Sequence, residues 1–284
     1  MTTDNESSRD PPIVPSSRWW WDLSTREFAS LDMSKIVAIL PVGAVEQHGP
    51  HLPVRVDAAI NEGIVRRAVE LMPADLHALV MPMTPVGKSN EHSAYPGTLT
   101  LPYDVLGRVW FELAKCAHRA GVRKIVFWNS HGGQPQLVDI VCRELRVELG
   151  MFAAGASWFR TIDTADLYDA HERRHGIHGG ESETSVMLHL HPELVSMQHA
   201  ANFEPMTAEL ETRGGLLSAE GRVGFGWQSQ DLHPAGAMGN AAAADATRGR
   251  EEVERAAVAL VRLVGEVAAY PLEAITDRTA FNGW

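Results

Sequence analysis

The segment from residue 46 to residue 57 concentrates groups that can bind a metal ion or transfer a proton. Glu46 and His48 lie two positions apart, and Asp57 ends the segment. Positions i and i+2 of an extended chain face the same side, so Glu46 and His48 can reach a common centre. Burying such groups without partners is costly, whereas a divalent metal ion removes that cost. We therefore expect a metal-dependent enzyme.

Asp57 has two interpretations. It precedes a helix that we expect to start near Ala58, and aspartate is a favoured N-cap residue at such a position. Beside Glu46 and His48, its two carboxylate oxygens also suit a bridge between paired metal ions. We favour the metal ligand, with the N-cap as the alternative.

The Asn-Ser-His-Gly-Gly sequence at residues 129–133 supplies a further candidate. It directly follows an apolar run. Gly132 and Gly133 permit positive φ and close approach of the backbone, which can aim His131 inward and leave room for a substrate. The alternative is a structural histidine at the end of a strand.

A glycine-rich loop at residues 175–181 leads into a helix that we expect to start near Ser182. Glu183, in the first turn of this helix, is a candidate metal ligand or catalytic base. Acidic residues there also suit the helix dipole without any further role. His178 lies on the loop, where an imidazole with a pKa near neutrality can shuttle protons. We expect His178 and Glu183 to act in catalysis.

The candidate metal ligands form a mixed nitrogen and oxygen set: Glu46, His48, Asp57, His131 and Glu183. Such donors suit Zn²⁺ or Mn²⁺, whereas copper or iron–sulfur centres favour thiolates. Two metal ions about 3.5–4 Å apart can activate water and polarise a carbonyl group. This donor set therefore indicates a hydrolase.

Strand-like and helix-like patterns alternate along the chain. The predicted strands are residues 36–40, 78–83, 124–128 and 152–158, and the predicted helices are residues 58–71, 103–120, 136–149, 184–191 and 251–269. This alternation predicts an α/β fold with three α/β/α layers around a mostly parallel sheet.

Polar clusters follow the first three predicted strands. Ligands in open α/β sheets bind beyond the carboxyl ends of the strands, so these clusters are expected to share one site. Glu91 and His92 follow the second strand and are expected to contact the substrate. The other expected substrate-binding residues are Gly132, Gly133, Trp158 and His178.

Composition narrows the class of protein. The 284 residues are 45% hydrophobic, enough for a substantial core, and the net charge is −11, which argues against a nucleic-acid partner. We find no apolar run long enough to span a membrane and no signal peptide. The two cysteines do not suggest a disulfide framework, so we expect a cytoplasmic protein.

We expect one large domain at residues 18–272, between a flexible arm at 1–17 and a tail at 273–284. The glycine-rich stretch 204–240 has few periodic runs and is expected to cover the site or contact another subunit.

Taken together, these motifs resemble the creatininase family of metal-dependent amidohydrolases. The matching parts, in family order, are residues 40–53 with Asp57, residues 91–92 with 95–98, residues 129–133, and residues 178–180 with 183–185. The resemblance implies a creatininase-like α/β/α fold, a two-metal centre and a homohexamer. It implies that Glu46, Asp57 and His131 hold one metal ion, and that His48 and Asp57 hold the other.

Two positions depart from the creatinine-hydrolysing members. Those members have a glutamate two residues after the matched histidine, which completes the second metal site, preceded by a tyrosine of the substrate pocket. Here the positions are Gly133 and Gly132. We therefore expect a substrate other than creatinine, with Glu183 as the replacement ligand.

The expected activity is hydrolysis of a small cyclic amide, such as a lactam or cyclic urea, by metal-activated water. Other branches of the family suggest ring opening of an oxidised cyclitol, deformylation of a formamide, or trimming of a peptide precursor. A metal-stabilised binding oligomer is the alternative without catalysis.

Overall fold

Four parallel strands form the centre of the molecule, which a computed structural model describes over residues 15–221 and 223–281. The strands are β1 (Val37–Val42), β2 (Ala78–Val80), β3 (Lys124–Asn129) and β4 (Phe152–Ser157). Their order across the sheet is β2-β1-β3-β4, and each neighbouring pair is parallel. Each strand overlaps a run predicted from the sequence.

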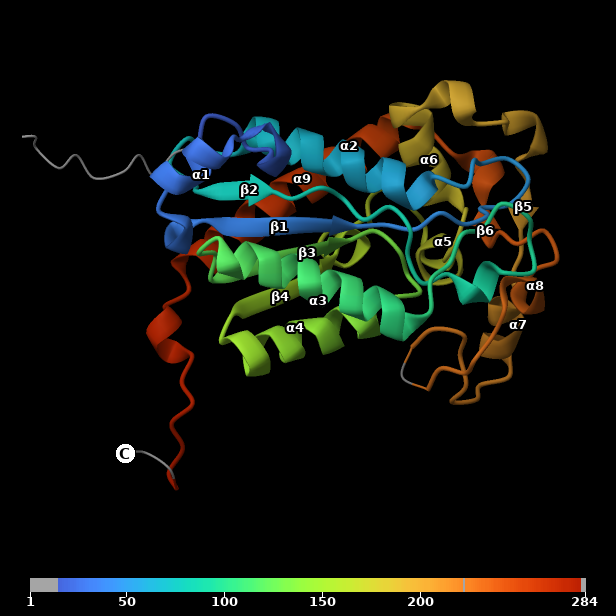
Figure 1. Ribbon diagram of the computed structural model, residues 1–284. Coiled ribbons are helices and arrows are strands. Elements are labelled where there is room, and N and C mark those ends of the chain that lie inside the picture. The colour runs from blue at the N-terminus through green and yellow to red at the C-terminus, as the bar shows by residue number, and fades with distance from the viewer. Residues whose placement is uncertain (1–14, 222, 282–284) are drawn as a thin grey trace, which may run out of the picture.

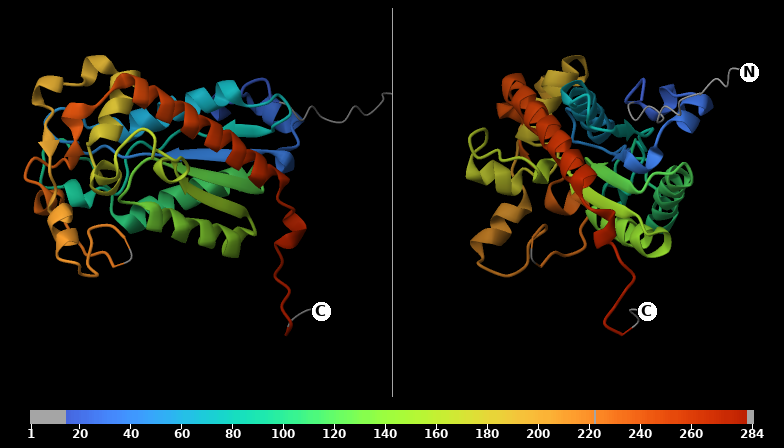
Figure 2. Two further views of the ribbon diagram at one scale, coloured as in Figure 1. Left: turned by 180° about the vertical axis from the view of Figure 1, so that it is seen from behind. Right: turned by 90° about the vertical axis from the view of Figure 1, so that its left-hand side faces the viewer.

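Helices cover both faces of the sheet, as Figures 1 and 2 show. On one face lie α2 (Val56–Leu71), α6 (Glu181–Leu190) and α9 (Ala246–Ala269), which contact one another. On the other lie α3 (Tyr103–Arg119) and α4 (Pro135–Leu149). The α/β/α prediction is confirmed. The helix that was expected to start at residue 182 or 184 starts at Glu181, and the helix expected from residue 251 starts at Ala246.

Alternate residues of β3 enter two separate hydrophobic cores. Val126 and Trp128 pack on the side of α2, α6 and α9. Ile125 and Phe127 pack on the side of α3 and α4. A strand buried on both faces needs apolar residues at every position, which explains why its sequence is a continuous apolar run.

Smaller elements gather at the carboxyl ends of the strands (Figure 1). They are α5 (Ala170–His175), β5 (Asn202–Phe203), α7 (Met206–Thr212), α8 (Ser229–Leu232) and β6 (Gly239–Asn240), with β5 and β6 antiparallel. The stretch 204–240 supplies three of these elements at the end of the sheet where a site is expected.

The helix α1 (Thr25–Ser30) lies at the opposite end of the sheet. Shortly before it in the chain, Trp19 bridges to Val80 on the edge strand β2, and the ring of Trp20 packs at a tilt against Phe28. The tryptophan run does not line the cavity at the expected site. Most of the predicted arm, residues 1–14, and the last three residues of the predicted tail lie outside the described residues. The domain boundaries stay predictions.

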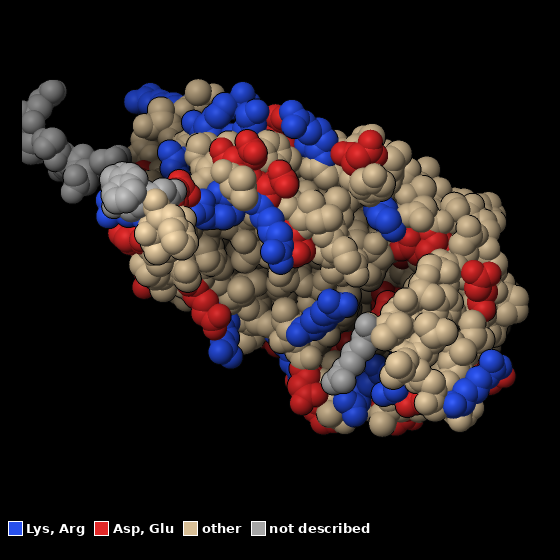
Figure 3. All heavy atoms as spheres, turned by 90° about the horizontal axis from the view of Figure 1, so that it is seen from below, with Lys and Arg blue, Asp and Glu red and all other residues tan. Residues whose placement is uncertain are grey.

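Acidic and basic side chains are interspersed on the face drawn in Figure 3, without a broad basic area. Among the described residues, no helix has the length and apolar character that crossing a membrane requires.

Two glycines of α9 are expected to respond oppositely to alanine. A Cβ at Gly249 would lie 2.0 Å from the backbone oxygen of Ser185, whereas nothing lies within 4 Å of a Cβ at Gly265. Gly249→Ala should therefore destabilise the protein by about 1–3 kcal/mol or more, because α9 must move away from α6. Gly265→Ala should stabilise it by about 0.5–1 kcal/mol through helix propensity. Urea unfolding of both variants measures this, and equal effects would contradict the prediction.

Candidate metal centre

Four chain segments bring the predicted metal ligands to the carboxyl ends of the strands. Glu46 and His48 follow β1, and His131 follows β3. Asp57 is the second residue of α2, and Glu183 is the third residue of α6. The N-cap interpretation of Asp57 is wrong, because α2 begins at Val56 and its N-cap residue is Arg55. The carboxylate of Asp57 is free to face the other ligands.

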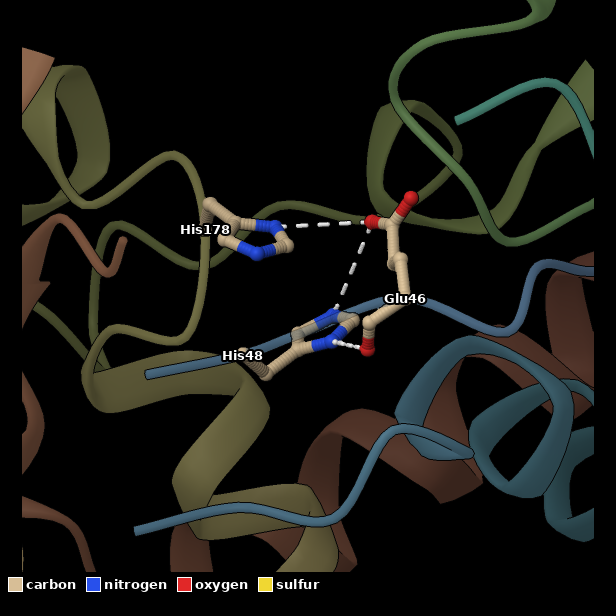
Figure 4. Close-up of side chains that lie close together, drawn as sticks. All are labelled: Glu46, His48 and His178. Atoms are coloured by element: carbon tan, nitrogen blue, oxygen red, sulfur yellow. Dashed lines mark hydrogen bonds and ion pairs between the residues drawn. The ribbon is translucent and has the colours of Figure 1, made fainter. Parts of the chain in front are cut away.

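Their side chains form three overlapping groups. Within each group, the ligand atoms all lie within 4.8 Å of one another. The groups are Glu46 with His48 and His178, Glu46 with Asp57 and His131, and His48 with Asp57 and Glu183. Figure 4 shows the first of them, in which both imidazoles face one oxygen of Glu46. The structure brings together all five candidate ligands that were predicted from the sequence, and it adds His178 to the cluster.

The two oxygens of Asp57 face different histidines. Its Oδ1 is 3.7 Å from His48 Nε2, and its Oδ2 is 3.8 Å from His131 Nδ1. Glu46 Oε1 lies 3.2 Å from the same nitrogen of His131, while Glu183 Oε2 lies 3.8 Å from His48 Nε2. This arrangement has the form expected of a carboxylate shared between two metal positions.

In its neutral form, each of these two histidines would direct the lone pair of one ring nitrogen at these carboxylates, so that a metal ion could be bound between them. The Nδ1–H of His48 donates to the Glu46 carbonyl oxygen (3.0 Å), so its Nε2 remains free in the neutral ring. The Nε2–H of His131 donates to the Lys88 carbonyl oxygen (2.8 Å), which leaves its Nδ1 free. Backbone hydrogen bonds of this kind fix the tautomer of metal-binding histidines.

The centre contains buried polar atoms that have no hydrogen-bond partner among the described residues. They include Glu46 Oε2, His48 Nε2 and Asp57 Oδ2. Burial raises the pKa of Asp57 to about 7, with Glu46 adding to this shift. Burial would lower the pKa of His48, but Asp57 and Glu183 raise it to about 9. The cluster needs protons or cations to neutralise it, and its donor set fits divalent metal ions.

An amide and a hydroxyl side chain, neither of which was predicted to have this role, hold the ends of the strands together. Asn61 Nδ2 donates to the carbonyl oxygens of Val42 (3.1 Å) and Trp128 (2.9 Å). Ser130 Oγ donates to the Asp57 carbonyl oxygen (2.7 Å). Asn61 lies one helical turn after Asp57, so helical spacing from a candidate ligand is the signal that could have found it.

Gln47 connects two further histidines. The Nε2–H of His178 donates to the Gln47 carbonyl oxygen (2.6 Å), while the Gln47 amide donates to His92 Nδ1 (2.7 Å). The rings of His92 and His178 stack with centroids 4.1 Å apart. Burial, with the nearby His48 and His92, holds the pKa of His178 well below its usual value. The other ring nitrogen of His178, Nδ1, faces Glu46 Oε1 at 3.6 Å.

A buried carboxylate fixes the loop that carries His178. Glu172 of α5 accepts hydrogen bonds from the backbone N–H of Glu181 (2.7 Å) and of Asn240 (2.8 Å). A Cβ at Gly180 would lie 2.6 Å from its Oε1, so glycine is needed there for close approach. The loop therefore depends on a residue that the sequence analysis did not single out.

Glu91 lies beside His131 and outside the three ligand groups. Its Oε1 is 3.4 Å from His131 Nε2, and Lys88 Nζ donates to its Oε2 (3.2 Å). A Cβ at Gly133 would lie only 1.6 Å from the Glu91 carboxylate. Among the described residues, Gly132 and Gly133 do not have positive φ, so that part of the prediction was wrong. In this arrangement, the Glu91 carboxylate occupies the space that a side chain at position 133 would take.

The centre opens into a cavity of about 240 Å³. All expected substrate-binding residues line it: Glu91, His92, Gly132, Gly133, Trp158 and His178. Trp158 is almost fully buried and belongs mainly to the core. Tyr168, Glu220 and Trp227, which were not predicted as site residues, also line the cavity.

A buried cluster of histidines and carboxylates at the ends of parallel strands, open to a small cavity, defines a metal-binding α/β protein of the hydrolase type. The family model described as "Creatininase: Creatinine amidohydrolase" matches residues 21–264. The chain belongs to the creatininase family. The family resemblance inferred from its motifs is confirmed.

Three related proteins span most of the domain. A mycofactocin precursor peptide peptidase of Mycolicibacterium smegmatis is 33% identical over 196 residues, covering 66% of this chain and 73% of the relative. A creatinine amidohydrolase of Pseudomonas putida is 30% identical over 203 residues, covering 66% of this chain and 76% of the relative. A solved mutant creatininase of the "Zn-Zn type" has a TM-score of 0.72 at 24% identity, covering 89% of this chain and 99% of the other. The similarity to this solved structure confirms the fold.

Proposed function

We propose that this protein hydrolyses an amide C–N bond of a small molecule, with two divalent metal ions, Zn²⁺ and/or Mn²⁺. The observation that carries the proposal is the sharing of Asp57 between two ligand groups that adjoin the cavity. Glu46, Asp57 and His131 would hold one ion, and His48, Asp57 and Glu183 the other. Bound in this way, the ions would polarise the substrate carbonyl and lower the pKa of a bound water towards about 7.

Glu183 and His178 have distinct proposed tasks. Glu183 Oε2 accepts a hydrogen bond from the Gly179 N–H (2.6 Å), which orients the carboxylate towards His48. The Nε2–H of His178 is held by the Gln47 carbonyl, so Nδ1 is the nitrogen available for proton exchange. We assign to this atom the acceptance of a proton from the attacking water and its later transfer to the leaving nitrogen. Glu91 would orient His131, and His92 would border the substrate.

The size of the cavity supports a small substrate. Its volume of about 240 Å³ is below the range of roughly 300–1,000 Å³ typical of sites for drug-sized ligands. A lactam or cyclic urea is the substrate class that we favour. The end of a peptide is the second candidate, because the 33% identical relative is a peptide peptidase. For this chain we further propose a cytoplasmic homohexamer, supported by two free cysteines and by exposed apolar residues on α3 and α4.

Metal analysis combined with a substrate screen tests the proposal. The purified protein should carry two divalent ions per chain and hydrolyse at least one member of a panel of lactams, cyclic ureas, formamides and short peptides. Glu183→Gln should reduce the metal content towards one ion per chain and lower activity by about 10–100-fold or more. Glu193→Gln, at an exposed position outside the cavity, is the matched control. Absence of stoichiometric metal, or unchanged activity in Glu183→Gln, would contradict the mechanism.

A further inference from the structure

The segment between α7 and α8 places one more carboxylate in the cavity wall. Glu220 lines the cavity together with His131, Glu183 and the two glycines after His131. A Cβ at Gly132 would have Glu220 Oε1, at 3.9 Å, as its one neighbour within 4 Å among the described residues. The carboxylate of Glu220 therefore faces the Gly132 backbone with no side chain between them.

The residues beside Glu220 are anchored. Ala219 is buried and packs in a small hydrophobic cluster with Leu232 and Met238. The indole N–H of Trp227 donates to the Ala219 carbonyl oxygen (3.1 Å). The backbone next to Glu220 is thus held against α8, while Glu220 itself is exposed where it lines the cavity.

Glu220 differs from the other carboxylates of the cavity wall. Glu91 pairs with Lys88, Glu172 accepts two backbone N–H groups, and Glu183 accepts one. Glu46 and Asp57 lie within the histidine cluster. Within residues 15–221 and 223–281, Glu220 makes no hydrogen bond or ion pair.

The surroundings of Glu220 make its carboxyl group harder to ionise. Desolvation in the cavity wall raises its pKa, and Glu183 adds to this shift, whereas Arg160 and His131 oppose it at a distance. Bringing a positive group next to the carboxylate would favour its ionised form. A charge-assisted hydrogen bond is also stronger in a partly desolvated cavity than in water.

We propose that Glu220 is a specificity-determining residue that binds a protonated amine of the substrate, across the cavity from the Gly132 backbone. This inference rests on the proposed amide hydrolysis and narrows the substrate to amides that carry an ammonium group. A neutral group at the same place would leave the carboxylate without a charged partner, and an anion would be repelled.

The test compares two lactams that differ in one group: 4-aminopyrrolidin-2-one, whose amine is protonated near neutral pH, and 4-methylpyrrolidin-2-one. Their binding to the metal-loaded enzyme is measured by ligand-observed NMR titration, which needs no turnover. The amino compound should bind about tenfold more tightly, the ratio expected of one charge-assisted hydrogen bond. Glu220→Gln should abolish this preference, and Glu220→Asp should retain part of it.

Glu209→Gln is the matched control, because Glu209 lies on α7 outside the cavity and pairs with Arg213. It should keep the full preference. Equal binding of the two lactams, binding of neither, or a preference that survives in Glu220→Gln would overturn the inference. Failure of the proposed function would give a different result. The protein would then carry no stoichiometric metal, or it would still prefer the amino compound in binding but hydrolyse no amide.

Discussion

Asp57→Asn is expected to remove both metal ions and to lower hydrolytic activity by at least about 10³-fold. Asp57 is common to two ligand groups, and its two oxygens face His131 and His48 separately. An amide offers one neutral oxygen, so neither group would keep a full set of anionic ligands. Loss of an activated water and of carbonyl polarisation removes several kcal/mol of transition-state stabilisation, which corresponds to this loss of rate.

The measurement combines elemental analysis with thermal unfolding in the presence and absence of a chelator. Wild-type protein should lose stability on chelation, by about 4 kcal/mol where free metal is a thousandfold above its dissociation constant. Asp57→Asn should show no such shift. The metal-free variant should be at least as stable as metal-free wild type, because the Asp57 Oδ2 atom has no partner and an amide NH₂ can donate to Glu46. Asp139→Asn, at an exposed position on α4, is the control.

A two-metal content that persists in Asp57→Asn would refute the shared-carboxylate arrangement. A variant that fails to fold is recognised by its circular dichroism, and Asp57→Glu then tests the same oxygen pair with the charge retained.

His178→Gln is expected to lower kcat by about 10²–10⁴-fold, the usual contribution of a positioned proton-transfer group. The Nε2–H of His178 is fixed by the Gln47 carbonyl, so its Nδ1 must exchange the proton. Glutamine can retain a hydrogen bond to that carbonyl but cannot carry the proton. The substrate's KM should change little, because the cavity wall keeps a polar side chain of similar reach.

Steady-state kinetics on the substrate found in the panel, together with metal content, check this prediction. His178 also lies near Glu46 and His48, so a variant that loses metal would indicate that it is a ligand instead. His199→Gln, exposed and outside the cavity, is the control. An unchanged kcat in the His178→Gln variant would contradict the proton-transfer role of His178.

The sheet and the main ligands could be predicted from the sequence because both have local signals. Residues 125–128 are apolar at every position, which is typical of a strand buried on both faces. The ends of these strands lie next to Glu46, His48 and His131 in the chain, so topology alone brings these residues together.

The supporting residues could not be predicted, because their partners are distant in the sequence. Glu172 holds backbone N–H groups of residues 181 and 240 through a contact that no spacing rule specifies. Glu220 reaches the cavity from a segment without periodicity. Asp57 was expected near the start of a helix, but the exact start depends on the loop that precedes it.

The close contact between Glu91 and Gly133 couples these two positions. A Cβ at position 133 would lie 1.6 Å from Glu91 Oε1, which is the far end of a flexible side chain. A larger residue at position 133 would therefore have to turn this carboxylate away from His131 Nε2, which it now faces at 3.4 Å. Substitutions at positions 91 and 133 should have non-additive effects on stability, so a library that varies one position should also vary the other.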